Sequence, residues 1–211
     1  MPDLILALDP TDREEALRIA GLASPHLDAI KIGYPLVLGA GLSIAREFEA
    51  FGLPLIADFK VADIPNTNRL IADQVFDAGF HAIICQGFPG SDSVLACVES
   101  AHGYGGECYV VAEMSHPGGT EFFSGGVAER IARLAVDCHA DGIIAPATRP
   151  DRVRALREIV GTRKILSPGV GAQGGDLSQI ADLVDGVIVG RAIYGADDPA
   201  LAAQSFSLLR R

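Results

Sequence analysis

Short apolar runs recur along the chain, and a segment with helical periodicity follows almost every one of them. The runs contain few polar residues, which is typical of parallel strands whose two faces are both buried. We expect strands at residues 4–9, 29–34, 55–60, 82–87, 108–114, 142–147, 164–167 and 186–189. We expect helices from near residue 12, over residues 43–51 and 66–78, from about residue 91 with a cap from Ser91 and Asp92, and over residues 127–139, 152–160 and 199–209.

Eight strands in alternation with helices predict a (β/α)8 barrel, also called a TIM barrel. A doubly wound parallel sheet is the alternative, but that fold has no particular requirement for eight units. No linker, repeat or low-complexity tract interrupts the alternation, so we expect residues 1–211 to form a single domain. One such barrel fits a chain of 211 residues.

Composition and charge narrow the classes of partner. The net charge is −10 and Lys and Arg do not cluster, which argues against a nucleic-acid-binding surface. No window approaches the roughly 18 uninterrupted apolar residues of a membrane span, so we expect no membrane segment. The chain enters its first apolar run at Leu4 without a basic leader, and a cytoplasmic protein is therefore expected. The four cysteines lie in apolar stretches without C-x-x-C spacing, which predicts reduced core thiols.

The strand expected at residues 55–60 carries charges where a buried strand should be apolar. Asp58 and Lys60 lie two residues apart, so on a strand their side chains point to the same face. Asp63 follows where the strand gives way to a turn at Pro65. Opposite charges at the end of an apolar strand are costly to desolvate unless they pair or take part in chemistry. An ordinary structural ion pair is the alternative for this motif taken alone.

Other expected strands also end in polar residues, and the carboxyl ends of the strands form the active-site face of such a barrel. These positions are Asp9, Lys31, residues 113–118, residues 167–176 and residues 189–191. Loops after the seventh and eighth strands commonly bind phosphate in this fold, and Arg191 would add a fork-shaped cationic donor. Four glycines between residues 169 and 175 would let backbone N–H groups approach an anion, and they predict a lid. Tight turning alone is the other explanation of these glycines.

Five motifs resemble the orotidine 5′-monophosphate decarboxylase family, in particular its short archaeal form. DFKVADIPNT at residues 58–67 resembles the family's signature, and KIGYPLVL at residues 31–38 resembles its second-strand lysine motif. The others are EMSHPG at residues 113–118, SPGVGAQGGD at residues 167–176 and VGRAIY at residues 189–194. The motifs extend over essentially the whole chain at compatible spacing. The resemblance implies a homodimeric enzyme that converts orotidine 5′-monophosphate to uridine 5′-monophosphate.

The resemblance also implies a role for each matching residue. Lys31, Asp58, Lys60 and Asp63 would form a network of alternating charge around the carboxylate that is lost. Asp63 and Thr67 would reach across the dimer interface into the partner's site. The substrate contacts would be Asp9, Lys31 and Thr67 for the ribose hydroxyls, Ser115 for the pyrimidine edge, Gln173 between base and phosphate, Gly190 and Arg191 for the phosphate, and Ile64 and Pro168 in addition.

The implied chemistry suits these residue types. Loss of CO2 from C6 of the pyrimidine leaves a carbanion without a conjugated electron sink. An ammonium beside that carbon can stabilise the charge and then donate a proton, and Lys60 is the expected donor. The carboxylates of Asp58 and Asp63 would favour its charged form. Asp58 near the substrate carboxylate would also disfavour the bound ground state. Neither a metal nor an organic cofactor is expected.

Three other functions are compatible with parts of the pattern. Mg2+-dependent 3-keto-gulonate-phosphate decarboxylases and hexulose-phosphate synthases share a D-x-K-x-x-D motif, but they place a glutamate ligand where this chain has Lys31. A cation there would repel the metal. A non-catalytic nucleotide-binding module would be expected to lack Asp58 or Lys60. A phosphosugar isomerase would need a catalytic base at the end of a strand, and this chain offers no such base that Lys60 does not obstruct. Gln86 and Asn66 depart from the archaeal pattern, where a histidine and a glutamate are frequent.

Overall fold

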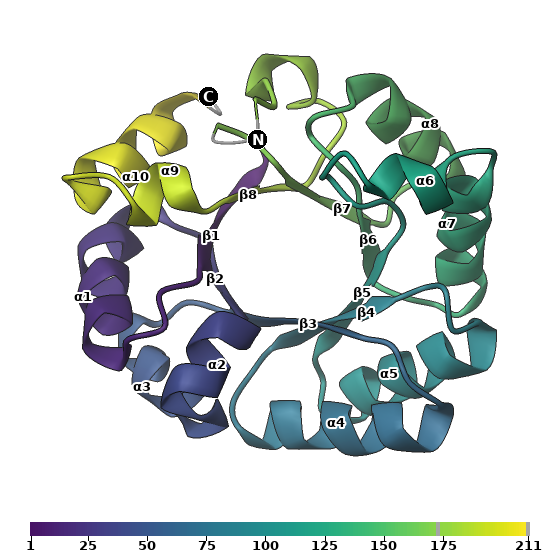
Figure 1. The fold of residues 1–211 in the computed structure, drawn as a ribbon, viewed down its shortest axis with the longest axis horizontal. Coiled ribbons are helices and arrows are strands. Elements are labelled where there is room, and N and C mark those ends of the chain that lie inside the picture. Colours follow the sequence, from purple (N-terminus) through teal and green to yellow (C-terminus); the bar gives the residue numbers. More distant parts are fainter. Residues whose placement is uncertain (172–173, 210–211) are drawn as a thin grey trace.

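The structure is a computed structural model, and it describes residues 1–171 and 174–209. Its parallel strands form a closed barrel in the order in which they occur in the chain (Figure 1). The barrel closes where β1 pairs with β8, with Ile5 opposite Ile188. The strands are β1 Asp3–Leu8, β2 Ala29–Gly33, β3 Leu55–Val61, β4 Ala82–Gln86, β5 Glu107–Val111, β6 Gly142–Ile144, β7 Lys164–Pro168 and β8 Gly186–Val189. The prediction of a (β/α)8 barrel is confirmed.

Helices surround the barrel and form its outer layer (Figure 1). The α-helices are α1 Arg13–Ala23, α2 Tyr34–Ala40, α3 Ala45–Phe48, α4 Pro65–Asp77, α5 Ser91–Gly103, α6 Gly119–Phe123, α7 Val127–Asp137, α8 Pro150–Val160, α9 Arg191–Tyr194 and α10 Pro199–Leu209. The 3-10 helices are η1 Ser24–His26, η2 Leu42–Ile44, η3 Glu49–Phe51 and η4 Leu177–Gln179. Because helices cover the outside and side chains fill the inside, strands such as β2 and β8 are buried at every position.

Some local elements differ from what the apolar pattern predicts. Residues 34–40 form helix α2, which was not expected; Pro35 lies in its first turn, where no N–H is needed for helical bonding. The expected helix over residues 43–51 is divided into η2, α3 and η3. Gly90, and not the Ser91–Asp92 pair, is the N-cap of α5; both residues lie within the first turn of the helix, where Asp92 accepts a hydrogen bond from the N–H of Ser93. Between β7 and β8, the described residues contain η4 and no α-helix.

The cysteines behave as the sequence predicts. All four are free thiols with buried side chains. The Sγ atoms of Cys85 and Cys108 lie 3.7 Å apart on the neighbouring strands β4 and β5. Their burial in the core is as predicted, and their reduced state stays a prediction. None of the helices in the described part of the chain is long and apolar enough to cross a membrane.

Candidate active site

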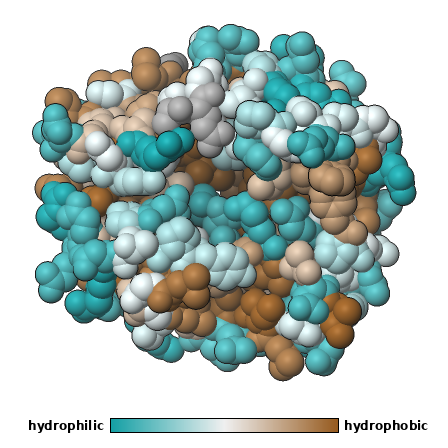
Figure 2. All heavy atoms as spheres, in the orientation of Figure 1, coloured by the Kyte–Doolittle hydropathy of each residue, from teal (hydrophilic) through white to brown (hydrophobic). Residues whose placement is uncertain are grey.

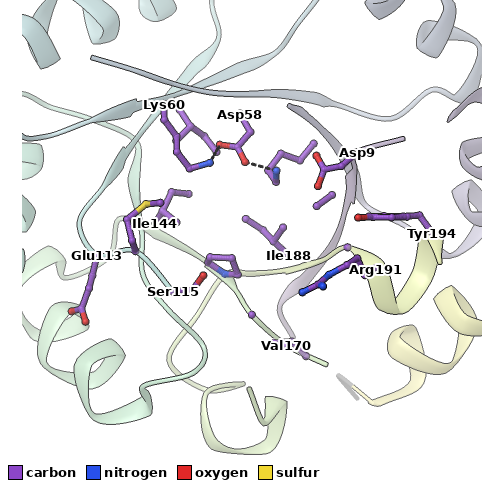
Figure 3. A pocket seen from close by; sticks show the side chains of 17 residues that line it. Asp9, Asp58, Lys60, Glu113, Ser115, Ile144, Val170, Ile188, Arg191 and Tyr194 are labelled. Carbon is purple, nitrogen blue, oxygen red and sulfur yellow. Dashed lines mark hydrogen bonds and ion pairs between the residues drawn. The ribbon is translucent and has the colours of Figure 1, made fainter. Parts of the chain in front are cut away.

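A cavity of about 240 Å³ opens at the carboxyl ends of the strands (Figure 3). Every strand, or the residues directly after it, contributes to the lining. Of the residues that the resemblance singles out, the cavity is lined by Asp9, Lys31, Asp58, Lys60, Ser115, Pro168, Gly190 and Arg191. Asp63, Ile64 and Thr67 do not line it, and Gln173 lies outside the described residues. The structure therefore brings most of the expected site together within one chain.

Asp58 joins two ammonium groups on one side of the cavity (Figure 3). Its Oδ1 accepts a hydrogen bond from Nζ of Lys60 at 2.6 Å, and its Oδ2 accepts one from Nζ of Lys31. Lys31 is only 5% exposed, whereas the Lys60 side chain is 37% exposed and lines the cavity. Burial by itself would raise the pKa of Asp58, but the two lysines outweigh burial and hold the pKa below its ordinary value. Asp58 is therefore a carboxylate at neutral pH, held between two cations.

Strand β3 is irregular where it carries these charges. Four residue steps separate the paired residues Ala57 and Val61, whereas their partners on β4 are two steps apart. Lys60 lies within this bulge and has a φ of 45°, a left-handed conformation that residues with a Cβ rarely adopt. Asp58 and Lys60 both line the cavity, as expected. A bulge, rather than a regular pleat, brings the two side chains together.

Asp63 lies in the turn between β3 and α4 and takes no part in the charge network of its own chain. It is exposed, and its Oδ1 accepts a hydrogen bond from the N–H of Ile64 at 2.7 Å. The buried Asn68 accepts from the N–H of Asp63 at 2.9 Å and donates to Oγ of Ser93 at 2.6 Å. Ser93 in turn donates to the carbonyl oxygen of Asp63 at 2.8 Å. A hydrogen-bonded turn thus presents Asp63 to the outside of the molecule.

Arg191 lies on the opposite side of the cavity from Asp58 (Figure 3). It directly follows Gly190 at the end of β8, and it is exposed. No carboxylate within residues 1–171 and 174–209 forms an ion pair with it. Tyr194 lines the cavity next to it, and burial, together with the Asp9 carboxylate, raises the pKa of the tyrosine hydroxyl. An unpaired guanidinium at the cavity favours an anionic group such as a phosphate.

The loop after β7 depends on its glycines. Gly169, Gly171 and Gly174 have φ values of 105°, 77° and 82°, which residues with a Cβ adopt only under strain. A Cβ on Gly175 would lie 2.7 Å from the carbonyl oxygen of Gly169, and that oxygen accepts a hydrogen bond from the N–H of Gly175 at 2.9 Å. Tight turning therefore accounts for these glycines, and closure of the loop as a lid stays a prediction.

Sequence reasoning does not single out the apolar part of the lining. It is formed by Ala7, Ile84, Met114, Ile144, Val170 and Ile188. Four of these side chains come from strands that are apolar along most or all of their length, namely β1, β4, β6 and β8, and in such strands the sequence does not tell inward-facing from outward-facing positions.

The role of Glu113 was also not predicted from the sequence, although this residue belongs to the EMSHPG motif. It is 3% exposed, and its carboxylate pairs with Arg149 at 2.8 Å and with Arg152 at 2.9 Å. Figure 3 shows this carboxylate pointing away from the cavity. The guanidinium of Arg149 also donates to the carbonyl oxygen of Met114. Glu113 and Arg149 therefore hold the segment that leads to Ser115. The two residues are far apart in the chain, so their spacing in the sequence does not predict the contact.

A closed barrel with charged side chains around a cavity at the carboxyl ends of its strands defines a (β/α)8-barrel enzyme. The paired charges on one side and the unpaired arginine on the other suit a substrate with a phosphate at one end and a reacting group at the other.

Comparison with known proteins identifies the family. Residues 2–206 match the model of the orotidine 5′-phosphate decarboxylase / HUMPS family. An orotidine 5′-phosphate decarboxylase of Methanosarcina barkeri is 58% identical over 206 residues, which cover 97% of this chain and 92% of the relative. An orotidine 5′-phosphate decarboxylase of Thermococcus kodakarensis is 52% identical over 205 residues, which cover 95% of this chain and 93% of the relative. The crystal structure of orotidine 5′-monophosphate decarboxylase from Methanocaldococcus jannaschii with the inhibitor BMP is 41% identical, covers 100% of this chain and 99% of that one, and has a TM-score of 0.96. This chain belongs to the orotidine 5′-phosphate decarboxylase / HUMPS family, as its motifs predict.

Proposed function

We propose that this protein decarboxylates orotidine 5′-monophosphate to uridine 5′-monophosphate, the last step of de novo pyrimidine synthesis. The arrangement of Lys31, Asp58 and Lys60 carries the proposal, because it faces a cavity with an unpaired Arg191 on the far side. The relatives at 58% identity, which are named for this reaction, support it. The free thiols favour a reducing compartment, and we place the reaction in the cytoplasm.

Lys60 is the group that stabilises the reacting carbon in this proposal. The bond between C6 and the carboxylate breaks, CO2 leaves, and the electron pair stays on C6. The ammonium of Lys60 stabilises that charge, gives a proton to C6 and becomes a neutral amine. Asp58 is ionised because its pKa is depressed, so beside the substrate carboxylate it would disfavour the ground state that loss of CO2 relieves. Lys31 holds Asp58 in place from the buried side.

The remaining side chains would bind the parts of the substrate that do not react. Binding energy gained at the phosphate would be used to hold C6 against Lys60. We assign Arg191 and Gly190 to the phosphate, Ser115 to the pyrimidine edge, Asp9 and Lys31 to the ribose hydroxyls, and Gln173 to the space between base and phosphate, with Pro168 as a further substrate contact. No metal and no organic cofactor takes part in this scheme.

We also propose a homodimer in which Asp63, Ile64 and Thr67 complete the site of the partner. All three lie outside the cavity of their own chain. Ile64 is 65% exposed, and on the flanking helices α2 and α4 Leu38 is 81% and Leu70 56% exposed. Hydrophobic residues gather in Figure 2 over the part of the surface where Figure 1 places α2 and α4. A second copy of the chain would cover this apolar surface.

A mixing experiment tests the shared site. Lys60→Ala and Asp63→Ala are each expected to be inactive alone. In a hybrid dimer, one site would have both changes and the other would have neither, so an equal mixture should recover about a quarter of wild-type activity. The measurement is turnover after subunit exchange, with exchange itself demonstrated by differently tagged chains. Exchange without recovery would show that Asp63 does not act across an interface.

A Mg2+-dependent reaction of a keto-sugar phosphate is the alternative function. Such enzymes would hold a glutamate ligand where this chain has Lys31. The Lys31 ammonium donates to Asp58, and a divalent cation placed beside it would be repelled. This contact favours the decarboxylation of orotidine 5′-monophosphate.

The first experiment follows the ultraviolet absorbance of orotidine 5′-monophosphate with purified protein in EDTA. We expect conversion to uridine 5′-monophosphate, and a loss in kcat of at least about 10⁴-fold in Lys60→Ala. Lys164→Ala is the matched control, because Lys164 pairs with Glu107 at 2.6 Å and does not line this cavity. Failure to convert orotidine 5′-monophosphate in EDTA, with Mg2+-dependent turnover of a keto-sugar phosphate, would assign the protein to the alternative.

A further inference from the structure

The bulge at the end of β3 identifies a further residue that acts on the proposed reaction. Among the described residues, Lys60 and His139 are the two non-glycine residues with a positive φ. His139 follows the end of α7, whereas Lys60 lies in the charge network. A left-handed conformation is unfavourable for a residue with a Cβ, so it persists only where surrounding contacts determine it. The contacts around Lys60 therefore show what holds its backbone.

Phe59 lies between Asp58 and Lys60 and belongs to a cluster of aromatic rings outside the cavity. It is 6% exposed, and its ring stacks on Tyr34 with centroids 4.9 Å apart and planes at 15°. A second ring, that of Phe80, meets it edge-on with centroids 5.9 Å apart. Tyr34 directly follows β2, and Phe80 precedes β4. The rings thus tie β3 to both neighbouring strands at the place where its ladder with β4 is interrupted.

Apart from its hydrogen bond to Asp58, the Lys60 side chain has little that fixes its position. Within the described residues its side chain forms a hydrogen bond from Nζ to Asp58, and more than a third of the side chain is exposed, at 37%. Lysine has many rotamers, so the direction in which its stem leaves the backbone decides where the ammonium lies. That direction is set by the bulge.

We infer that Phe59 is a positioning residue: clamped by Tyr34 and Phe80, it holds the bulge that aims the Lys60 ammonium at the reacting carbon. The inference rests on the proposed function, because it takes Lys60 as the proton donor. It adds that the donor is placed by an aromatic clamp on the outer side of the barrel. Phe59 touches no substrate and acts through Lys60.

A role in core packing alone makes a different prediction. Loss of packing would lower the free energy of unfolding and the fraction of folded protein, but each folded site would keep its kcat. A misplaced ammonium would lower kcat for each folded site, since an error of about 1 Å can cost as much as 10²-fold. The substrate KM would change little, because the phosphate and ribose contacts lie elsewhere.

The test compares Phe59→Leu, Tyr34→Leu and Tyr34→Phe with wild type. Tyr104→Leu is the matched control: Tyr104 stacks on Phe76 at 5.5 Å and 18°, and it is 49% exposed where Tyr34 is 48% exposed. The concentration of folded sites is measured by titration with the inhibitor BMP, and light scattering is used to compare all variants in the same oligomeric state. We expect kcat to fall about tenfold or more in Phe59→Leu and about threefold in Tyr34→Leu, with KM within about twofold. Tyr34→Phe, which keeps the ring, and Tyr104→Leu should retain wild-type kcat.

Three results would overturn the inference. The first is a kcat per folded site within about twofold of wild type in Phe59→Leu, whatever its stability. The second is an increase in KM without a decrease in kcat. The third is an equal effect of Tyr34→Leu and Tyr104→Leu, and this comparison decides the question if Phe59→Leu does not fold. In each case a wild-type protein that converts orotidine 5′-monophosphate leaves the proposed function standing, whereas a wild type that does not would overturn both.

Discussion

The two sides of the active-site cavity are built in opposite ways. On the side of β2 and β3, Lys31, Asp58 and Lys60 satisfy one another's charges before any ligand arrives. On the side of β7 and β8, Arg191 has no carboxylate partner among the described residues, and the loop after β7 is rich in glycine. Charges that must already be in place for the reaction are thus fixed by the protein itself. Charge that serves binding is left to be satisfied by the substrate.

Burial explains why the two sides differ. Lys31 is 5% exposed, and an ammonium so far from water is costly unless a carboxylate pairs with it. Arg191 is exposed, so water can solvate its guanidinium until an anion binds. The first side consequently contributes to folding as well as to chemistry, and the second side contributes chiefly to binding.

Replacement of Asp58 by Asn tests the folding contribution of the first side. Removal of the charge leaves Lys31 buried without a carboxylate, and we expect Asp58→Asn to lower the free energy of unfolding by about 3 kcal/mol at pH 7. Because the pKa of Asp58 is depressed in the folded state, its stabilisation is complete above its ordinary pKa of about 4 and is lost as the pH falls through the depressed value.

The difference between wild type and Asp58→Asn should therefore shrink below about pH 4. Urea denaturation at a series of pH values measures it. Asp63→Asn is the control, because Asp63 is exposed and forms no ion pair in the described chain. A constant difference across the pH range would show that the charge of Asp58 does not stabilise the fold.

Replacement of Arg191 by Ala tests the second side. We expect kcat/KM for orotidine 5′-monophosphate to fall by about 100-fold, because a charge-assisted hydrogen bond to the phosphate is lost. Turnover of orotidine, which has no phosphate, should not change, and neither should the free energy of unfolding. Arg18→Ala is a suitable control, since Arg18 pairs with Glu15 on α1 and does not line the cavity. An equal loss for both substrates would contradict the assignment of Arg191 to the phosphate.

A smaller effect is expected from the backbone of Lys60. A protein with glycine at a regular strand position is normally less stable than one with alanine there, by about 0.5–1 kcal/mol. At a left-handed position the glycine variant is instead the more stable of the two, by about 1 kcal/mol. Lys60→Gly should therefore be more stable than Lys60→Ala, because Lys60 has a φ of 45°. Lys164 begins β7 without a positive φ, so Lys164→Gly should be less stable than Lys164→Ala. Thermal unfolding of the four variants gives both differences, and the same order at both positions would rule out backbone strain at Lys60.

Much of this architecture was predictable because its signals are local. Each strand of the barrel is an apolar run of a few residues, and each longer helix buries one face at helical spacing, as Ala128, Ile131, Ala132 and Ala135 do on α7. The short elements were not predictable in the same way. Helix α2 and the division of residues 42–51 depend on how the chain must turn to reach the next strand, which packing against the barrel decides.

The sequence by itself determined that eight apolar strands would alternate with helices, and that charges such as Asp58, Lys60 and Arg191 would lie at the carboxyl ends of those strands. It could do so because hydrophobic period and strand direction are properties of short segments. The tertiary structure alone decided which charges meet: Lys31 reaches Asp58 across 27 residues, and Glu113 reaches Arg149 across 36. It also decided the bulge that aims Lys60, because a mismatch between two strands exists only once the strands have paired.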